Sequence, residues 1–533
     1  MMDLKQALSI LSKSSPYAVC TERKSTNDKL AGFKKYIYVE TDIEADFQKA
    51  LTSLERGEII FLCGSSGDGK SEILTRYSQQ WKSKVDFHLD ATHSFKPNQT
   101  AIQTLDELFS STSESKRPLV VGINIGMLGN YAEEGDEEKH RIIKQSIKSF
   151  LEKRTDSIPA EHIYLDFEQY PKFTLNEHGN TSDFGDKLIS RLTEKSLDNP
   201  FYAVFDNQVK SRGNSKITAN FALLGIKSVQ KNIISLLVRT RLIKDQFLTA
   251  RAMLDFIYQI LVMDGYLFDN LFSGGDNELL ENIHGFDPAI LHTRRIDEFM
   301  LHFGLGIEDK RFKEFENKIQ SIGIYGLLTP NSYIRLYYIL KDEEDFGGTY
   351  VEYFKKEFDE SLVEQYSNAW LLHKNFDASG KQKKEINKIY KEVIIAAINR
   401  YCNRNTPNLD KDVYLTSEHN GFKIAVELDV KANFSLISSH VISKIGSFDV
   451  FIDVENHTLA PVPITINLLE LMIKINQGYR PNKHDKNAIL LLDEIIEQII
   501  AVANKKNTLF IFKNKSRYKV SNEGNEYFEV SGI

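Results

Sequence analysis

The sequence predicts an α/β fold in which a core with a parallel sheet precedes a helical segment and a mixed α+β C-terminal domain. In the stretch 57–74, GEIIFLCGSSGDGKSEIL, a short apolar run leads into a glycine-rich loop and then into helix-forming residues. Strand-like and helix-like segments then alternate to about residue 210. Such alternation favours a parallel sheet whose ligand lies at the carboxyl ends of the strands.

The stretch contains a phosphate-binding motif. Gly64, Gly69, Lys70 and Ser71 have the spacing G-x-x-x-x-G-K-[ST], between an expected buried strand at 59–63 and an expected helix. Backbone N–H groups of such a loop and the positive end of the helix dipole face an anion. Lys70 would reach the terminal phosphates of ATP, and the Ser71 hydroxyl would bind Mg²⁺. A flexible Gly/Ser loop that meets the pattern by chance is the alternative.

We therefore expect a P-loop NTPase core, AAA-like, with a helical lid. The residues expected to hold the nucleotide are Gly64, Ser65, Ser66, Gly67, Asp68, Gly69, Lys70, Ser71, Glu72 and Arg251.

Hydrolysis also requires a carboxylate at a strand end that orders the magnesium shell. Asp90 ends the expected strand 84–91, while Asp166 and Glu168 lie in the expected strand 162–170. The order of strands cannot be read from one sequence, so both aspartates remain catalytic candidates, with Asp90 also a metal candidate beside Ser71. Either acid could instead simply close a strand at the surface.

Two further residues have positions typical of AAA-type ATPases. Asn124 ends the apolar strand of 117–128 before Gly126 and an expected turn, where a side chain that senses the γ-phosphate is kept. Thr249 can cap a helix that carries Arg251 in its first turn, like the start of a lid helix. Asn124 could equally be a turn former, and Arg251 a surface arginine. Four other arginines, Arg239, Arg241, Arg294 and Arg295, could act as arginine fingers toward a neighbouring subunit, but salt bridges are their expected role.

The predicted parts are an N-terminal segment at 1–34, a nucleotide-binding domain at 35–212, a helical lid or middle domain at 213–345 and the C-terminal domain at 346–533. In the last, GFKIAVELDVKANF (421–434) alternates like one half-exposed antiparallel strand. Asp429 and Lys431 within it match a D-x-K fragment of metal-dependent nucleases. Strand alternation explains these charges better, so we expect no nuclease activity from this chain alone.

Composition, charge and cysteine spacing argue against several classes of protein. The 533 residues are 41% hydrophobic and 26% charged, with a formal net charge of −7 that argues against autonomous binding of duplex DNA. Cys20, Cys63 and Cys402 are too scattered for a disulfide framework or a zinc site. No apolar run reaches the ~18 residues of a membrane span, and the N-terminus has no signal-peptide pattern. A cytoplasmic protein without membrane contact is expected.

The chain resembles the DNA phosphorothioation-dependent restriction protein DptF (DndF) family over about its first three hundred residues. The motif and five further segments support the resemblance: 11–19, 38–47, 124–128, 248–258 and 285–299. It implies a bacterial ATPase subunit that acts with two partner proteins to restrict DNA lacking phosphorothioate linkages. DNA would be engaged through that complex, and a homo-oligomer is left open. The alternatives are a nucleotide-gated assembly module with little hydrolysis of its own and, less favoured, a small-molecule kinase.

Overall fold

The computed structural model has two compact units, which we describe separately. The first comprises Met1–Thr174, Thr181–Thr240 and Gln246–Asp359, and the second comprises Leu175–Asn180, Arg241–Asp245 and Glu360–Ile533. The described residues are 2–15, 29–92, 94, 98–170, 172, 174–176, 179–181, 183–244, 248–307, 310–326, 328–358, 361–406, 409–410, 412–442, 445–513, 516–524 and 527–532. Cys20 lies outside them, whereas Cys63 and Cys402 are buried free thiols.

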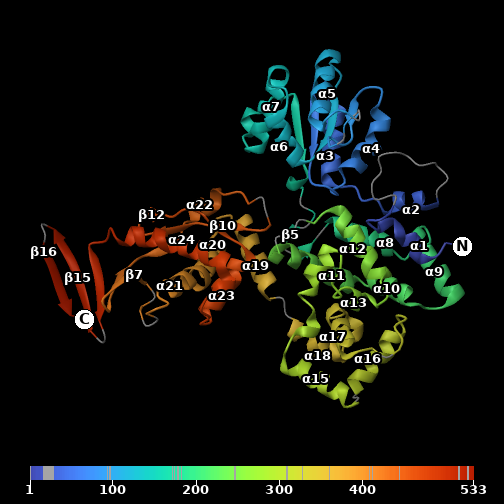
Figure 1. The fold of residues 1–533 in the computed structure, drawn as a ribbon. Coiled ribbons are helices and arrows are strands. Elements are labelled where there is room, and N and C mark those ends of the chain that lie inside the picture. The colour runs from blue at the N-terminus through green and yellow to red at the C-terminus, as the bar shows by residue number, and fades with distance from the viewer. Residues whose placement is uncertain are drawn as a thin grey trace. The chain divides into compact units, whose positions relative to one another are not determined.

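A four-stranded parallel sheet organises the first unit (Figure 1). Its strands are β1 (Ile59–Cys63), β2 (Asp86–His88), β3 (Leu119–Ile123) and β4 (His162–Asp166), in the order β2-β3-β1-β4. Every residue of β1 is buried, as its unbroken apolar run requires for a strand covered on both faces. The predicted α/β fold with a parallel sheet is confirmed.

Helices cover both faces of this sheet. Helices α5 (Ala101–Ser115), α6 (Ile125–Glu134) and α7 (Glu137–Leu151) form one core with β1 and β3. On the other face, α3 (Asp42–Ser53) and α4 (Lys70–Trp81) pack against the alternate residues of β1, β3 and β4. Because β1 pairs in parallel with both β3 and β4, the carboxyl ends of these three strands lie at one edge of the sheet.

A glycine permits the close packing of α4. A Cβ on Gly122 of β3 would lie 2.4 Å from Leu74 Cδ1 and 2.6 Å from the Leu89 carbonyl oxygen. Only a residue without a side chain fits there, so α4 and the chain after β2 can approach β3 directly.

The rest of the first unit is helical, as the sequence predicts for 215–345. The N-terminal helix α1 packs against α9, and the backbone N–H of Lys13 donates to Asp255 of α12. These elements are α1 (Leu4–Leu8), α2 (Lys29–Ile37), α8 (Asp183–Thr193), α9 (Pro200–Arg212), α10 (Lys216–Leu224), α11 (Lys227–Lys244), α12 (Ala250–Val262), α13 (Leu267–Asn270), α14 (Glu278–His284), α15 (Arg294–Gly304), α16 (Lys310–Gln320), α17 (Pro330–Ile339) and α18 (Tyr350–Phe354).

Within the described residues, no single helix is long and apolar enough to cross a membrane. The α10 and α11 pair meets the length and composition test only when joined across a bend of 83°.

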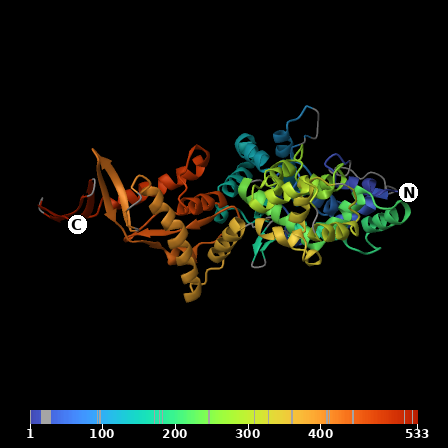
Figure 2. The ribbon, with the colours of Figure 1, turned by 90° about the horizontal axis from the view of Figure 1, so that it is seen from below.

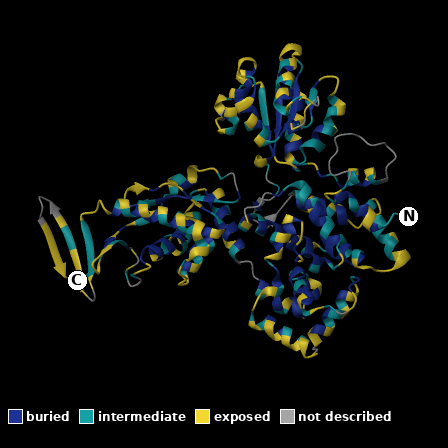
Figure 3. Cartoon of the chain, in the orientation of Figure 1, coloured by how far each residue is buried: buried dark blue, intermediate teal, exposed yellow. Residues whose placement is uncertain are grey.

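The second unit combines helices with antiparallel strands, and its largest sheet has the order β16-β15-β14-β8-β7. Figures 1 and 2 show the β15 and β16 hairpin at the outer end of this sheet, and Figure 3 shows that these two strands are largely exposed. The elements are β5 (Thr174–Asn176), β6 (Gly179–Thr181), α19 (Ser361–Lys374), α20 (Gly380–Ile389), a π-helical turn (Tyr390–Ile395), α21 (Ala396–Cys402), β7 (Val413–His419), β8 (Phe422–Glu427), β9 (Val430–Ala432), α22 (Phe434–Ser439), β10 (Phe448–Val450), β11 (Ile452–Val454), β12 (His457–Thr458), β13 (Val462–Ile464), α23 (Ile466–Asn476), α24 (Lys486–Ala503), β14 (Thr508–Lys513), β15 (Ser516–Gly524) and β16 (Tyr527–Gly532).

The single strand predicted at 421–434 is wrong. The strand is interrupted between β8 and β9, and these two strands belong to different sheets. Helix α22 then begins at Phe434. Leu428 at the break is buried and its N–H donates to the Asp412 carbonyl, while the Asp429 N–H donates to the Glu455 carboxylate. These long-range contacts override an alternation that looks continuous along the sequence.

A buried histidine predicts a pH dependence for the stability of the second unit. The His373 ring stacks on Tyr390, its Nδ1 donates to the Ala369 carbonyl, and its buried Nε2 has no hydrogen-bond partner among the described residues. Burial lowers the pKa of His373 to about 4. Between pH 6.5 and 4 the unfolded chain binds a proton that the folded chain excludes, so the free energy of unfolding falls as the pH falls.

At pH 4 this one histidine lowers the free energy of unfolding by about 3 kcal/mol. Urea unfolding of wild type and His373→Phe at pH 7 and pH 4.5 measures it, with the exposed His457→Phe as the matched control. An equal pH dependence in wild type and His373→Phe would contradict it.

Candidate functional site

The glycine-rich loop of residues 64–69 joins the end of β1 to the start of α4. Gly67 and Gly69 have φ angles of +87° and +110°, a left-handed backbone conformation that glycine adopts without strain. A Cβ on Gly64 would lie 2.9 Å from Asp68 Oδ2 and 3.0 Å from Phe167 Cβ. The glycines at these positions therefore set the curvature of the loop.

Lys70 begins α4 and turns its side chain back over the loop. Its Nζ donates hydrogen bonds of 2.9 Å to the Gly64 carbonyl and 2.6 Å to the Ser65 carbonyl. Burial lowers the pKa of Lys70, and the nearby carboxylates of Asp68 and Asp90 oppose that shift. The ammonium group thus lies at the concave side of the loop, where an incoming anion would meet it.

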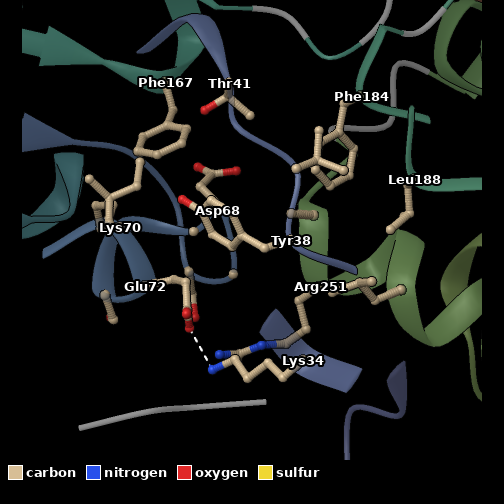
Figure 4. A pocket seen from close by; sticks show the side chains of 18 of the residues that line it. Lys34, Tyr38, Thr41, Asp68, Lys70, Glu72, Phe167, Phe184, Leu188 and Arg251 are labelled. Carbon is tan, nitrogen blue, oxygen red and sulfur yellow. Dashed lines mark hydrogen bonds and ion pairs between the residues drawn. The ribbon is translucent and has the colours of Figure 1, made fainter. Parts of the chain in front are cut away.

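The loop forms one wall of a cavity of about 350 Å³ (Figure 4). This volume is within the range of small-molecule sites. The polar wall includes residues 66–72 together with Asp90, Thr92 and Asn124. The opposite wall is mainly apolar and comes from residues 10–11, α2 and the segment after it, α8 and α12: Ile10, Leu11, Ile37, Val39, Phe184, Leu188 and Leu254.

The two aspartate candidates differ in their position relative to the cavity. Asp90 lines it, and its Oδ1 accepts hydrogen bonds from the N–H and hydroxyl of Thr92. Asp166 is buried at the end of β4, accepts the Glu168 N–H, and is not among the lining residues. Burial raises the pKa of Asp166. Of the two, only Asp90 is open to a ligand in the cavity.

Asn124 lines the cavity at the end of β3, but the turn predicted after it is wrong. Helix α6 starts at Ile125, and Asn124 Oδ1 caps it by accepting the Met127 N–H at 2.6 Å. A strand end and a helix N-cap favour the same residue type, so the sequence could not distinguish them.

Arg251 lies in the first turn of α12, where the sequence places it. Thr249 caps this helix through the Ala252 N–H, and the Arg251 N–H donates to the Gly67 carbonyl at 3.2 Å. A Cβ on Gly67 would lie 3.2 Å from Arg251 Cβ, so the helix start contacts the loop directly. Arg251 lines the cavity beside Lys34.

Lys34 and Lys172 also belong to the site, although the sequence does not single them out. Lys34 Nζ pairs with Glu72 at 2.6 Å at the rim of the cavity, as Figure 4 shows. Lys172 pairs with Asp68 of the loop at 3.3 Å. Each lysine contacts a residue 38 or 104 positions away, a separation that no local pattern signals.

The remaining candidates are not among the residues that line the cavity. Arg294 and Arg295 form ion pairs with Glu298 and Glu357, as expected. Asp429 pairs with Lys431 at an exposed position. In the described part of the chain, no group of three or more His, Cys, Asp or Glu side chains could hold a metal ion.

Comparison with known proteins gives no match: no family model, curated protein or solved structure matches this chain.

Proposed function

We propose that the chain is a P-loop ATPase, AAA-like, that binds Mg²⁺-ATP in the 350 Å³ cavity. The observation that carries the proposal is the position of Lys70 over a left-handed glycine loop, at the polar wall of a cavity whose other wall is apolar. ATP has a matching division, because its triphosphate is polar and its planar base is largely apolar.

The polar wall suits the phosphates. The start of α4 presents backbone N–H groups and the positive end of its dipole, and Lys70 supplies a charge. The Ser71 hydroxyl and the Asp90 carboxylate are oxygen donors of the kind that Mg²⁺ prefers, and both line the cavity. When bound, the ion would neutralise charge that develops on the phosphates. Asn124 and Arg251 also line the cavity and would contact the terminal phosphate.

The apolar wall suits an adenine ring. Val39 is buried in the extended segment between α2 and α3, and its N–H and C=O have no hydrogen-bond partner within the described residues. Buried backbone groups without a partner are costly, so a ligand edge that bonds them is favoured. Arg191 of α8 holds this segment by donating to the Tyr36 and Tyr38 carbonyls.

A nucleotide-gated assembly module with slow hydrolysis is the second candidate. The observation that favours it is that Asn124 and Asp90 both accept local hydrogen bonds, from Met127 and from Thr92. Turnover would require these bonds to rearrange, whereas nucleotide binding would not.

The resemblance to the DptF family supports a more specific role, as the ATPase subunit of a bacterial restriction complex that acts on DNA lacking phosphorothioate linkages. With a net charge of −7, this subunit would bind duplex DNA weakly alone and would engage it through two partner proteins.

Steady-state ATPase measurements with and without duplex DNA and the two partners test the role. We expect low turnover alone, stimulation in the assembled complex, and no nicking of unmodified plasmid by the chain with Mg²⁺-ATP. If the full complex did not stimulate ATP hydrolysis, the nucleotide-gated assembly module would be the remaining candidate function. Nicking by the chain alone that disappears in Asp429→Ala would contradict the absence of nuclease activity.

A further inference from the structure

The loop proposed to bind phosphates contains a buried carboxylate. The Asp68 side chain is fully buried, and its Oδ2 accepts the Ser65 N–H at 2.6 Å. The same oxygen lies where a Cβ on Gly64 would clash. Asp68 thus braces the loop from within, between the end of β1 and the turn at Ser65.

A negative charge at this position opposes the binding of a polyphosphate. Asp68 lines the cavity, and its charge reaches Lys70, the residue placed to meet the phosphates. Repulsion between like charges is strong where water is excluded. The loop can therefore use Asp68 as a brace only if a cation neutralises it.

Lys172 is the cation that contacts Asp68. Its Nζ lies 3.3 Å from Asp68 Oδ1, its side chain is 9% exposed, and it lies 5.5 Å from the centre of the Phe167 ring. Phe167 and Asp68 Oδ2 both lie against the position of a Gly64 Cβ, so the pair and this ring pack together under the start of the loop. Breaking a buried ion pair leaves an uncompensated charge, which costs more than the pair itself contributes.

We propose that Lys172 is a positioning residue of the nucleotide site, which neutralises Asp68 and holds it against the Ser65 N–H so that the loop accepts a polyphosphate. This inference rests on the proposed nucleotide site. It predicts that loss of Lys172 weakens ATP binding whereas loss of the Asp68 charge does not, and that neither change affects the binding of adenosine.

The test measures dissociation constants for Mg²⁺-ATP and for adenosine by calorimetry on the full chain. Lys172→Met should weaken ATP binding roughly 10- to 100-fold and leave adenosine unchanged, because an unpaired carboxylate then faces the phosphates. Asp68→Asn keeps an oxygen for the Ser65 N–H and removes the negative charge from the loop, so ATP should bind as tightly as in wild type or more tightly. The double variant Asp68→Asn/Lys172→Met should return to within a few-fold of wild type. Lys210→Met, which breaks an exposed pair with Asp206 on α9, is the matched control.

Thermal melting and circular dichroism check the fold of each variant. If Lys172→Met does not fold, the other two variants decide. The inference would be overturned if Asp68→Asn bound ATP more weakly than wild type. It would also be overturned if the double variant did not return to within a few-fold of the wild-type ATP affinity. Equal ATP affinity in folded Lys172→Met and wild type would also overturn it while leaving the proposed function intact. A wild-type chain that binds no nucleotide would instead overturn the proposed function, and this inference with it.

Discussion

Lys70→Ala is expected to weaken Mg²⁺-ATP binding on the order of 100-fold or more. Each charge-assisted hydrogen bond is worth about 1.5–3 kcal/mol, and in the proposed site Lys70 would donate to both terminal phosphates. The loop itself should persist, because its curvature comes from Gly64, Gly67 and Gly69. Calorimetric titration with ATP measures the effect, and adenosine affinity should stay near the wild-type value.

Lys82→Ala is the matched control for this variant. Lys82 follows the last residue of the same helix and is exposed, so its removal tests charge and helix composition away from the loop. An unchanged ATP affinity in folded Lys70→Ala would remove the claim that this loop binds the phosphates.

Asp90→Asn is expected to lower the rate of ATP hydrolysis on the order of 100-fold, with a smaller change in ATP affinity. A carboxylate that orders the magnesium shell acts mainly as charge develops in the transition state, so its loss appears in kcat. Asp90 lines the cavity and its charge reaches Lys70. The measurement is steady-state hydrolysis under the conditions that give the highest wild-type rate.

Asp166→Asn is the internal control, because it makes the same chemical change at the end of another strand of the same sheet, β4. Asp166 is buried outside the cavity lining and accepts the Glu168 N–H, a bond that asparagine can keep. We expect a rate within a few-fold of wild type. Loss of hydrolysis in Asp166→Asn and not in Asp90→Asn would reverse the assignment, and two silent variants would exclude both.

The parallel sheet could be predicted because its signals are local. An unbroken apolar run such as 59–63 must be buried on both faces, and the glycine pattern after it fixes the turn into α4. Thr249 and Arg251 were found for the same reason, since a helix cap and its first turn lie within a few residues.

The features that the sequence did not reveal all depend on contacts between distant segments. The order β2-β3-β1-β4 decides which strand ends adjoin the loop, and no single strand encodes it. The pairs of Lys34 with Glu72 and Lys172 with Asp68 join different elements. The break between β8 and β9 arises because Leu428 and Asp429 bond to residues outside their own strand.

The apolar half of the cavity was missed for a related reason. Its residues come from residues 10–11, α2 and the segment after it, α8 and α12, and each is an ordinary apolar side chain in its local sequence. Only their meeting in space opposite the glycine loop makes them a candidate base site.

Calorimetric titration of the wild-type chain with Mg²⁺-ATP, ADP and adenosine tests the central claim most directly. The account predicts one site per chain, binding of all three ligands through the apolar wall, and affinity that rises with the number of phosphates through the loop and Lys70. Undetectable binding of Mg²⁺-ATP, or equal affinity for ATP and adenosine in the folded wild-type chain, would contradict it.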